Sequence, residues 1–268
     1  FVMSRVLYNA FTVFISEFLN AFVLLSNFVI VPAAAYGSQL ALGALGVTLV
    51  YGILRFSNFA HGDTMAFGTM VVILVTWGFQ KLGISIEPLP TALLAIPFGI
   101  LGTMAMVLLS DRLVYKHQRK VRAAPVVFLI SSIGLMFILN GLVRFIIGTG
   151  DQRFTDGERF IMRYGEFKAM TGLDEGIAFK TSQGLTVVTA VVVVAALFWF
   201  LGRTRAGKSM RAYSDNEDLA LLSGINPERV VMITWMLSAT LATIAVATPP
   251  LLHFVASWLP QCQRPWWP

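Results

Sequence analysis

Hydrophobic residues fill seven stretches of the chain, and polar residues gather between them. Each stretch has about 17 residues or more, the length at which an apolar helix can cross a bilayer core. A helix satisfies its backbone polar groups internally, which makes it the fold that such stretches adopt in lipid. We therefore predict an all-α polytopic membrane protein with about seven transmembrane helices. The predicted spans are 14–35, 36–54, 64–79, 91–109, 126–147, 185–201 and 230–252.

The amino-acid composition supports this class. Of 268 residues, 56% are hydrophobic and 13% are charged, whereas a soluble domain carries about 25% charged residues. Basic loops beside the membrane explain the net charge of +6, so we expect no nucleic-acid partner. The single cysteine, Cys262, excludes an intrachain disulfide. Because His61, His117 and His253 are scattered, we expect no metal site, and no other cofactor is indicated.

Basic residues orient the predicted spans. They crowd the loop 112–122 and the start of the segment 203–229. Short loops rich in Lys and Arg stay on the cytoplasmic side. With seven spans, this rule also places the N-terminus and Arg55 in the cytoplasm and the long loop 148–184 outside. We therefore predict a multi-pass protein with a cytoplasmic N-terminus.

Polar and small residues at 51–63 interrupt the apolar pattern between the second and third predicted spans. Irregular backbone at membrane depth needs protein or a water-filled cavity around it, and transporters use such breaks at gates and binding sites. We predict a broken or re-entrant stretch near 55–63 that borders a translocation path. In it, Gly62 stays small for close backbone approach and Asp63 caps the next helix. A polar cytoplasmic turn, which Arg55 supports, is the alternative. The candidate path residues are Asn58, His61, Gly62, Asp63 and, from the span 126–147, Asn140.

The segment 203–229 is polar but carries helix signals. Ser214 and Glu217 match a capping box, in which Ser caps a helix and Glu reaches back to it. Gly224 suits the left-handed position that ends a helix, and Asn226-Pro227 suits the start of the next. These signals predict a short cytoplasmic helix at 215–223, which docks on a partner; an ordinary connecting loop is the alternative. The candidate docking residues are Arg211, Glu217, Asp218, Leu219, Leu222 and Gly224.

Motifs for enzyme chemistry are absent from the sequence. There is no GxxxxGK[ST] phosphate loop, no GxSxG and no HExxH. Ser57 and His61 have helical spacing, but no oxyanion donors accompany them. We expect a transport protein without catalytic residues.

Three segments together resemble a known family. They are TLVYGILRFSNFAHGD, SSIGLMFILNGLVRFIIG and RTRAGKSMRAYSDNEDLALLSGINPERV, in this order. They resemble the LivH-like permease subunit of branched-chain amino acid ABC importers, over residues 18–246. Urea and short-chain amide permeases share much of these motifs, so they are the alternative substrates.

The resemblance implies a multi-pass subunit of the bacterial inner membrane that works by alternating access. It implies a second, LivM-like permease, two cytoplasmic ATPase subunits that hydrolyse the ATP, and a periplasmic substrate-binding protein. The segment 203–229 then corresponds to the family's cytoplasmic coupling loop, with Gly224 as its central glycine.

The likeness stops after Val246, where prolines and tryptophans cluster without a regular period. We predict an incomplete permease domain at 1–252, with the family's last spans missing, and an aberrant, disordered tail at 253–268. A truncated membrane protein that transports nothing is therefore one alternative. Another is a proton-coupled carrier that uses His61 and Asp63, against which the docking segment and the lack of a charged pair deep in a span argue.

Overall fold

The computed structural model describes residues 2–83, 92–148, 160–162, 169 and 179–247. The predicted tail 253–268, the last residues of the seventh predicted span and most of the loop 148–184 lie outside the described residues. The described part contains six helices that are long and apolar enough to cross a membrane: Val13–Leu54, His61–Lys81, Leu93–Lys120, Pro125–Ile147, Gln183–Arg203 and Pro227–Val246. The all-α polytopic class is confirmed.

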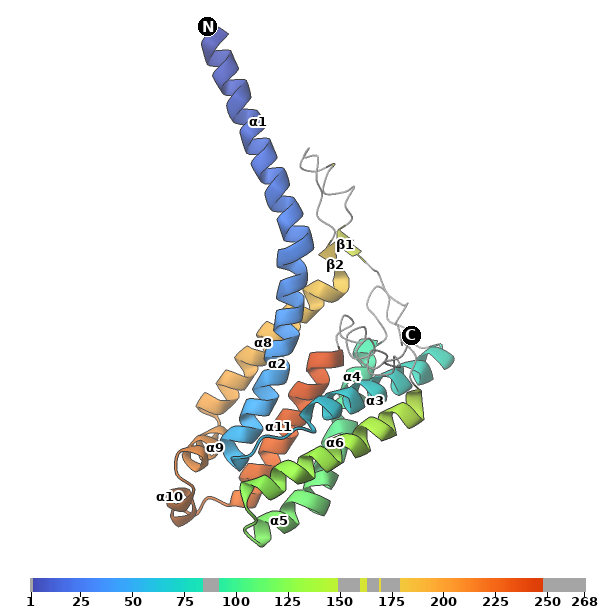
Figure 1. The fold of residues 1–268 in the computed structure, drawn as a ribbon, viewed down its shortest axis with the longest axis vertical. Helices are drawn as coiled ribbons and strands as arrows, with labels where there is room; N and C mark the ends of the chain where they lie inside the picture. Colours follow the sequence, from blue (N-terminus) through green and yellow to red (C-terminus); the bar gives the residue numbers. More distant parts are fainter. Residues whose placement is uncertain (1, 84–91, 149–159, 163–168, 170–178, 248–268) are drawn as a thin grey trace, which may run out of the picture.

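The first two predicted spans, 14–35 and 36–54, are not separate helices, so that division was wrong. Helix α1 (Val2–Leu25), a π-helical segment (Ser26–Ile30) and α2 (Val31–Leu54) form one continuous rod (Figure 1). Pro32 has no N–H to donate, but the wider turn before it carries the chain past this gap, with the Val31 N–H donating to the Ser26 carbonyl.

The loop predicted at 112–122 is also mostly helical. Helix α4 (Ala92–Ser110) continues through a π-helical segment (Asp111–Tyr115) into α5 (Lys116–Lys120), because the sequence offers no Gly or Pro to stop it. The chain turns only after Lys120, where Arg122 has a φ of 50°. Helix α6 (Pro125–Ile147) then begins with proline in its first turn, where the missing N–H costs nothing.

Helix α11 (Pro227–Ala247) is the most buried of the six spans and forms the centre of the bundle. It packs against α2, α4 and α3 (His61–Lys81) (Figure 1). Helix α8 (Thr181–Arg203) packs against α2 and shares an apolar cluster with α2 and α11. Among the described residues, the core is mainly apolar but also contains fourteen buried polar residues, most of them Ser or Thr. The Thr243 hydroxyl donates to the Thr103 hydroxyl at 2.9 Å and so joins α11 to α4.

Two further helices follow α8 at one end of the bundle: α9 (Arg205–Asp215) and α10 (Glu217–Leu222). The end of α2, helix α5 and the start of α11 lie at this same end, and the paired strands β1 (Phe160–Met162) and β2 (Phe179–Lys180) lie at the other (Figure 1). The segments with the most basic residues therefore share one end of the molecule.

Candidate functional site

The predicted break near 55–63 is present. Helix α2 ends at Leu54, α3 begins at His61, and the residues between them are not helical. Arg55 has a φ of 55°, a left-handed conformation that is uncommon for a non-glycine residue. The Phe59 N–H donates to the Ser132 hydroxyl of α6 at 3.2 Å. Ser132 is seven residues beyond Pro125, or about 11 Å along α6, so the break lies inside the bundle.

Asn58 holds the start of α3. Its side chain is buried, and its Oδ1 accepts hydrogen bonds from the Ala60 N–H at 3.1 Å and from the Tyr115 hydroxyl at 3.4 Å. The expectation that Asp63 caps this helix was wrong, because α3 begins two residues before Asp63. The Asp63 carboxylate instead accepts from the Asn140 amide at 2.8 Å, which joins α3 to α6. Asn140 is fifteen residues beyond Pro125, about 23 Å along α6 and well inside the span.

His61 is wedged between α3, α2 and α11. Its side chain is buried, and its Nδ1 lies 3.4 Å from the Ser238 hydroxyl, while Nε2 is buried with no hydrogen-bond partner among the described residues. A Cβ on Gly46 would lie only 2.7 Å from His61 Cε1. The close approach therefore occurs at Gly46. A Cβ on Gly62 meets no atom of the described residues within 4 Å, so the need for a small residue at Gly62 stays a prediction.

An aromatic cluster that sequence reasoning missed supports Asn58. Tyr115 stacks on Trp235 of α11 with ring centroids 5.4 Å apart, and Phe56 lies 5.3 Å from Tyr115. The Trp235 indole N–H donates to Asp111 Oδ1 at 2.8 Å. Tyr115 was expected in a cytoplasmic loop and Trp235 in the middle of an apolar span, so no local signal indicated that they meet.

Helix α9 was also missed, and it explains an error in the predicted cap. Thr204 caps α9, its hydroxyl accepting from the Gly207 N–H at 3.0 Å. Ser214 therefore lies in the last turn of α9 and cannot begin the next helix. Its hydroxyl donates to the Gly52 carbonyl at 3.0 Å, and its own carbonyl accepts from the Arg55 guanidinium. Both contacts fasten α9 to the end of α2.

The short helix α10 is capped by Asn216, whose side chain accepts from the Leu219 N–H at 3.1 Å. The predicted capping box at Ser214 and Glu217 is thus wrong. The Glu217 carboxylate accepts from the Tyr213 hydroxyl at 2.6 Å instead of reaching back to Ser214. Burial of Tyr213, together with this bond, raises the pKa of its hydroxyl above its ordinary value.

The predicted end of α10 is confirmed. Gly224 has a φ of 79°, its N–H donates to the Leu221 carbonyl at 3.0 Å, and the Ile225 N–H donates to the Ala220 carbonyl at 3.1 Å. These two bonds form a Schellman motif, which needs a left-handed residue at this position. Asn226 then caps α11, its side chain accepting from the Arg229 N–H at 3.3 Å, and Pro227 opens that helix as expected.

Helix α10 turns its apolar side outward. Leu219 is 61% exposed and Leu222 is 85% exposed, whereas Ala220 faces the bundle and is buried. The other predicted docking residues, Arg211, Glu217 and Asp218, are exposed as well. Exposed leucines on a short helix beside charged groups are typical of a surface that another protein covers.

The comparisons with known proteins identify the family. The model of one family, described as the branched-chain amino acid transport system / permease component, matches residues 29–258. The chain belongs to this permease family. The matched residues include the break at 55–60, α10 and α11.

Curated relatives agree with this assignment. The chain is 28% identical to the high-affinity branched-chain amino acid transport system permease protein LivH of Escherichia coli K12, over 78% of this chain and 65% of that protein. LivH of Salmonella typhimurium gives 27% identity over the same shares. The corresponding protein BraD of Pseudomonas aeruginosa is 27% identical over 81% of this chain and 68% of its own length. The chain thus spans 65% of the length of the two LivH proteins. No solved structure matches it.

The permease connects its two candidate regions through α11. Helix α10 passes through Gly224 and Asn226 into α11, whose Trp235 stacks on Tyr115, and the Tyr115 hydroxyl bonds Asn58 at the break. Arg55 and Ser214 form a second connection. Packed side chains and hydrogen bonds therefore link α10 to the break.

Proposed function

We propose that this permease is a transmembrane subunit of an ATP-driven importer for branched-chain amino acids. The names of the LivH and BraD relatives support this substrate class. The observation that carries the mechanism is α10, a short helix with two exposed leucines that is joined to the central span α11 by a Schellman motif and an Asn-Pro start.

In this proposal, two cytoplasmic ATPase subunits hydrolyse ATP, and one of them grips α10. A second, LivM-like permease and a periplasmic substrate-binding protein complete the importer. An isolated helix of six residues is unstable in water, so α10 depends on its caps, on buried Ala220 and on the partner. The coupling residues are Arg211, Glu217, Asp218, Leu219, Leu222 and Gly224.

We further propose that the break borders the translocation path. Asn58 and His61 set its geometry, and Asp63 and Asn140 supply the polar groups that lie deepest in the membrane. Polar and charged groups inside spans face protein or a water-filled route, because lipid cannot solvate them. Gly62, next to His61, leaves open space beside this route. Movement of α11 changes the Tyr115–Asn58 contact and thereby opens or closes it.

The end of the bundle that carries α5, α9 and α10 is proposed to face the cytoplasm of a bacterium, because its basic residues fit the positive-inside rule. A cytoplasmic N-terminus remains our proposal. The apolar segment Val13–Leu54 has 42 residues, about 63 Å of helix, and a bilayer core is only about 30 Å thick. That length suits two crossings, but a second crossing would require the continuous rod to reverse its direction within the membrane.

Impermeant thiol labelling tests this orientation in a Cys262→Ser background. A cysteine at Lys208 and one at Ser4 should be protected in intact cells, and one at Thr155 should react. Labelling at Lys208 would reverse the whole orientation. Labelling at Ser4 alone would show that Val13–Leu54 crosses once and would remove the cytoplasmic N-terminus.

The coupling proposal is tested by co-purification and uptake with the complete importer. Leu222→Asp should remove the ATPase subunits from the purified complex and abolish leucine uptake, because a carboxylate cannot enter an apolar groove without a partner. Leu222→Met should behave like the parent, because it preserves apolar volume. Retention of the ATPases and of uptake by Leu222→Asp would refute the role of α10. Urea or acetamide uptake without leucine uptake would change the substrate and leave the coupling proposal intact.

A further inference from the structure

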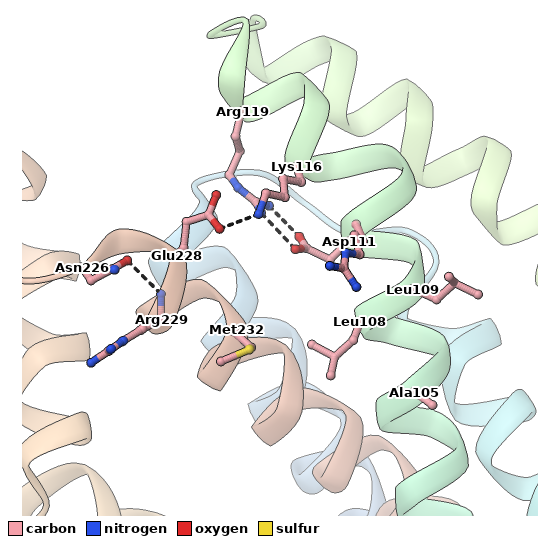
Figure 2. Close-up of a pocket in the computed structure, with 11 residues that line it drawn as sticks. Ala105, Leu108, Leu109, Asp111, Lys116, Arg119, Asn226, Glu228, Arg229 and Met232 are labelled. Atoms are coloured by element: carbon pink, nitrogen blue, oxygen red, sulfur yellow. Dashed lines mark hydrogen bonds and ion pairs between the residues drawn. The ribbon is translucent and has the colours of Figure 1, made fainter.

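A groove of about 630 Å³ lies where α4 continues toward α5 and α11 begins (Figure 2). The helices α4 and α5 form one wall, and the first turns of α11 form the other. Its apolar lining includes Leu108 and Met232, which face each other across the groove, and its charged lining lies toward α5 and the start of α11 (Figure 2). A groove with this gradient suits a molecule that has an apolar tail and a charged head.

The charges around the groove do not balance. Arg112, Lys116, Arg119 and Arg229 line it together with only two acids, Asp111 and Glu228. Each acid already has a basic partner: Glu228 pairs with Lys116 at 2.6 Å, and Asp111 pairs with Arg119 at 2.6 Å. Arg112 makes no ion pair or side-chain hydrogen bond with any residue of the described ranges. The groove therefore carries excess positive charge that needs an anion.

Arg229 and Arg112, the two basic residues of the groove without an ion pair among the described residues, lie in different parts of it. In Figure 2, the Arg229 side chain points away from Lys116, Glu228 and Asp111, so it adds charge only at the outer edge. Arg112 belongs to the wall formed by α4 and α5, in which Arg119 and Lys116 remain partly exposed. We therefore assign the binding of an anion to this wall.

The depth of Arg112 indicates where the anion comes from. The apolar segment Leu93–Lys120 qualifies as a span, and Arg112 is nineteen residues beyond its start, which is about 29 Å of helix and close to the thickness of a bilayer core. Its neighbours Leu109 and Leu113 are 50% and 70% exposed. An unpaired guanidinium among exposed leucines at this depth lies at the level of the lipid phosphates.

We propose that this groove binds an anionic phospholipid, such as phosphatidylglycerol, by its phosphodiester headgroup. Arg112 donates to the phosphate, and the free N–H groups of Lys116 and Arg119 add to the positive field. An acyl chain lies along Leu108 and Met232. Basic pockets between spans on the cytoplasmic side are where anionic headgroups are held in membrane proteins. The bound lipid packs between α5 and the first turn of α11, next to the junction with α10.

The test uses the full chain, purified in detergent and incubated with phosphatidylglycerol or with phosphatidylcholine of the same acyl chains. Native mass spectrometry then counts the retained lipid. Arg112→Gln should lower phosphatidylglycerol retention by about fivefold, the effect of removing one basic group near an anionic surface, and should leave phosphatidylcholine unchanged. Arg112→Lys should retain most of the binding. The matched control is Arg205→Gln, which removes an exposed charge from α9, away from the groove.

Three outcomes would overturn the proposal. Equal phosphatidylglycerol retention by the parent and Arg112→Gln, with both monodisperse, would exclude Arg112 as the headgroup ligand. Displacement of the lipid by millimolar inorganic phosphate would assign the site to a free anion. Unchanged lipid retention with loss of the ATPase subunits from the Arg112→Gln complex would assign the groove to an acidic segment of those subunits.

Discussion

Residues 55–60 and residues 204–226 both separate membrane-length helices, but they treat their side chains in opposite ways. The first segment buries the polar residue Asn58 and leads into buried His61, whereas the second exposes the apolar residues Leu219 and Leu222. Asn58 finds its partners within this chain, at Ala60 and Tyr115. The leucines of α10 find none in the described residues. Asn58 at the break thus finds its hydrogen-bond partners within the chain, whereas α10 exposes apolar side chains that a partner protein could cover.

The two segments also touch, because the Arg55 guanidinium donates to the Ser214 carbonyl. The break at 55–60 is held by contacts within the chain, whereas the outer side of α10 is exposed. We therefore expect a force on α10 to act on the break through the contact between Arg55 and Ser214. The following substitutions test this difference between the break, which is held within the chain, and α10, which we expect a partner to bind.

Replacing Gly224 should have the largest effect. Its φ of 79° is strongly disfavoured for a β-branched residue, and holding a non-glycine residue there costs about 1–3 kcal/mol. Gly224→Val should therefore disrupt the Schellman motif that ends α10. Both ATPase co-purification and uptake should then fall to background. Gly224→Asn is the matched control, since Asn tolerates the left-handed region. Normal coupling in the valine variant would show that α10 transmits nothing through this junction.

Asn58→Leu should have the next largest effect, and of a different kind. It leaves the Ala60 N–H and the Tyr115 hydroxyl without their acceptor, at about 1–3 kcal/mol for each buried group. Uptake should fall several-fold while membrane abundance and ATPase co-purification stay near normal, because α10 is untouched. Asn58→Asp keeps the acceptor and should lose less. Unimpaired uptake by Asn58→Leu would make the break a plain turn with no part in the path.

Local sequence signals were sufficient where a short stretch decides the structure. The Schellman end at Gly224, the start at Asn226-Pro227 and the break after Leu54 each depend on residues within one or two turns. The capping box failed because Ser214 already belonged to α9. Helix α9 was hidden because its sequence is polar, and only a narrow face that includes Met210 and Tyr213 is buried.

Long-range contacts could not be predicted from the sequence. Tyr115 and Trp235 are 120 residues apart, and their stacking depends on a π-helical segment that rotates Tyr115 toward α11. The continuous rod through Pro32 depends on a second such segment. The helical period of hydrophobic residues does not indicate where a helix takes a wider π-helical turn. The two π-helical segments were therefore found only in the structure.

A pair of glycines beside His61 gives a smaller test of how tightly the break is held. Gly46→Ala places a methyl group 2.7 Å from the His61 ring, so the ring must move away from residue 46. Overpacking of this kind costs about 1–3 kcal/mol. Gly62→Ala meets no atom of the described residues within 4 Å. It lies in the first turn of α3, so it should leave stability unchanged or raise it by less than the about 1 kcal/mol that alanine gains over glycine in a helix interior.

Unfolding of the two alanine variants in mixed detergent micelles measures both changes. The signs should be opposite, with Gly46→Ala destabilised and Gly62→Ala unchanged or stabilised. If Gly62→Ala were the more damaging of the two for uptake at normal stability, the open space at Gly62 would belong to the translocation path. If Gly46→Ala were neutral, His61 would not be confined as described.

The ion pair between Lys116 and Glu228 should have the smallest effect, although it joins α5 to the first turn of α11 next to the junction with α10. Its side chains are 34% and 56% exposed, and exposed pairs contribute only about 0.2–1 kcal/mol. A double-mutant cycle with Lys116→Met and Glu228→Gln should give a coupling free energy of unfolding in that range, which shrinks as salt screens the pair. The partly buried bond between Trp235 and Asp111 joins α11 to the π-helical segment before α5. Trp235→Phe should cost more, about 1.5–3 kcal/mol, because the acceptor is charged. A coupling energy above about 2 kcal/mol for Lys116 and Glu228 would contradict this order. The exposed ion pair, and not the contacts of Trp235, would then be the main link between the start of α11 and the helix α4–α5.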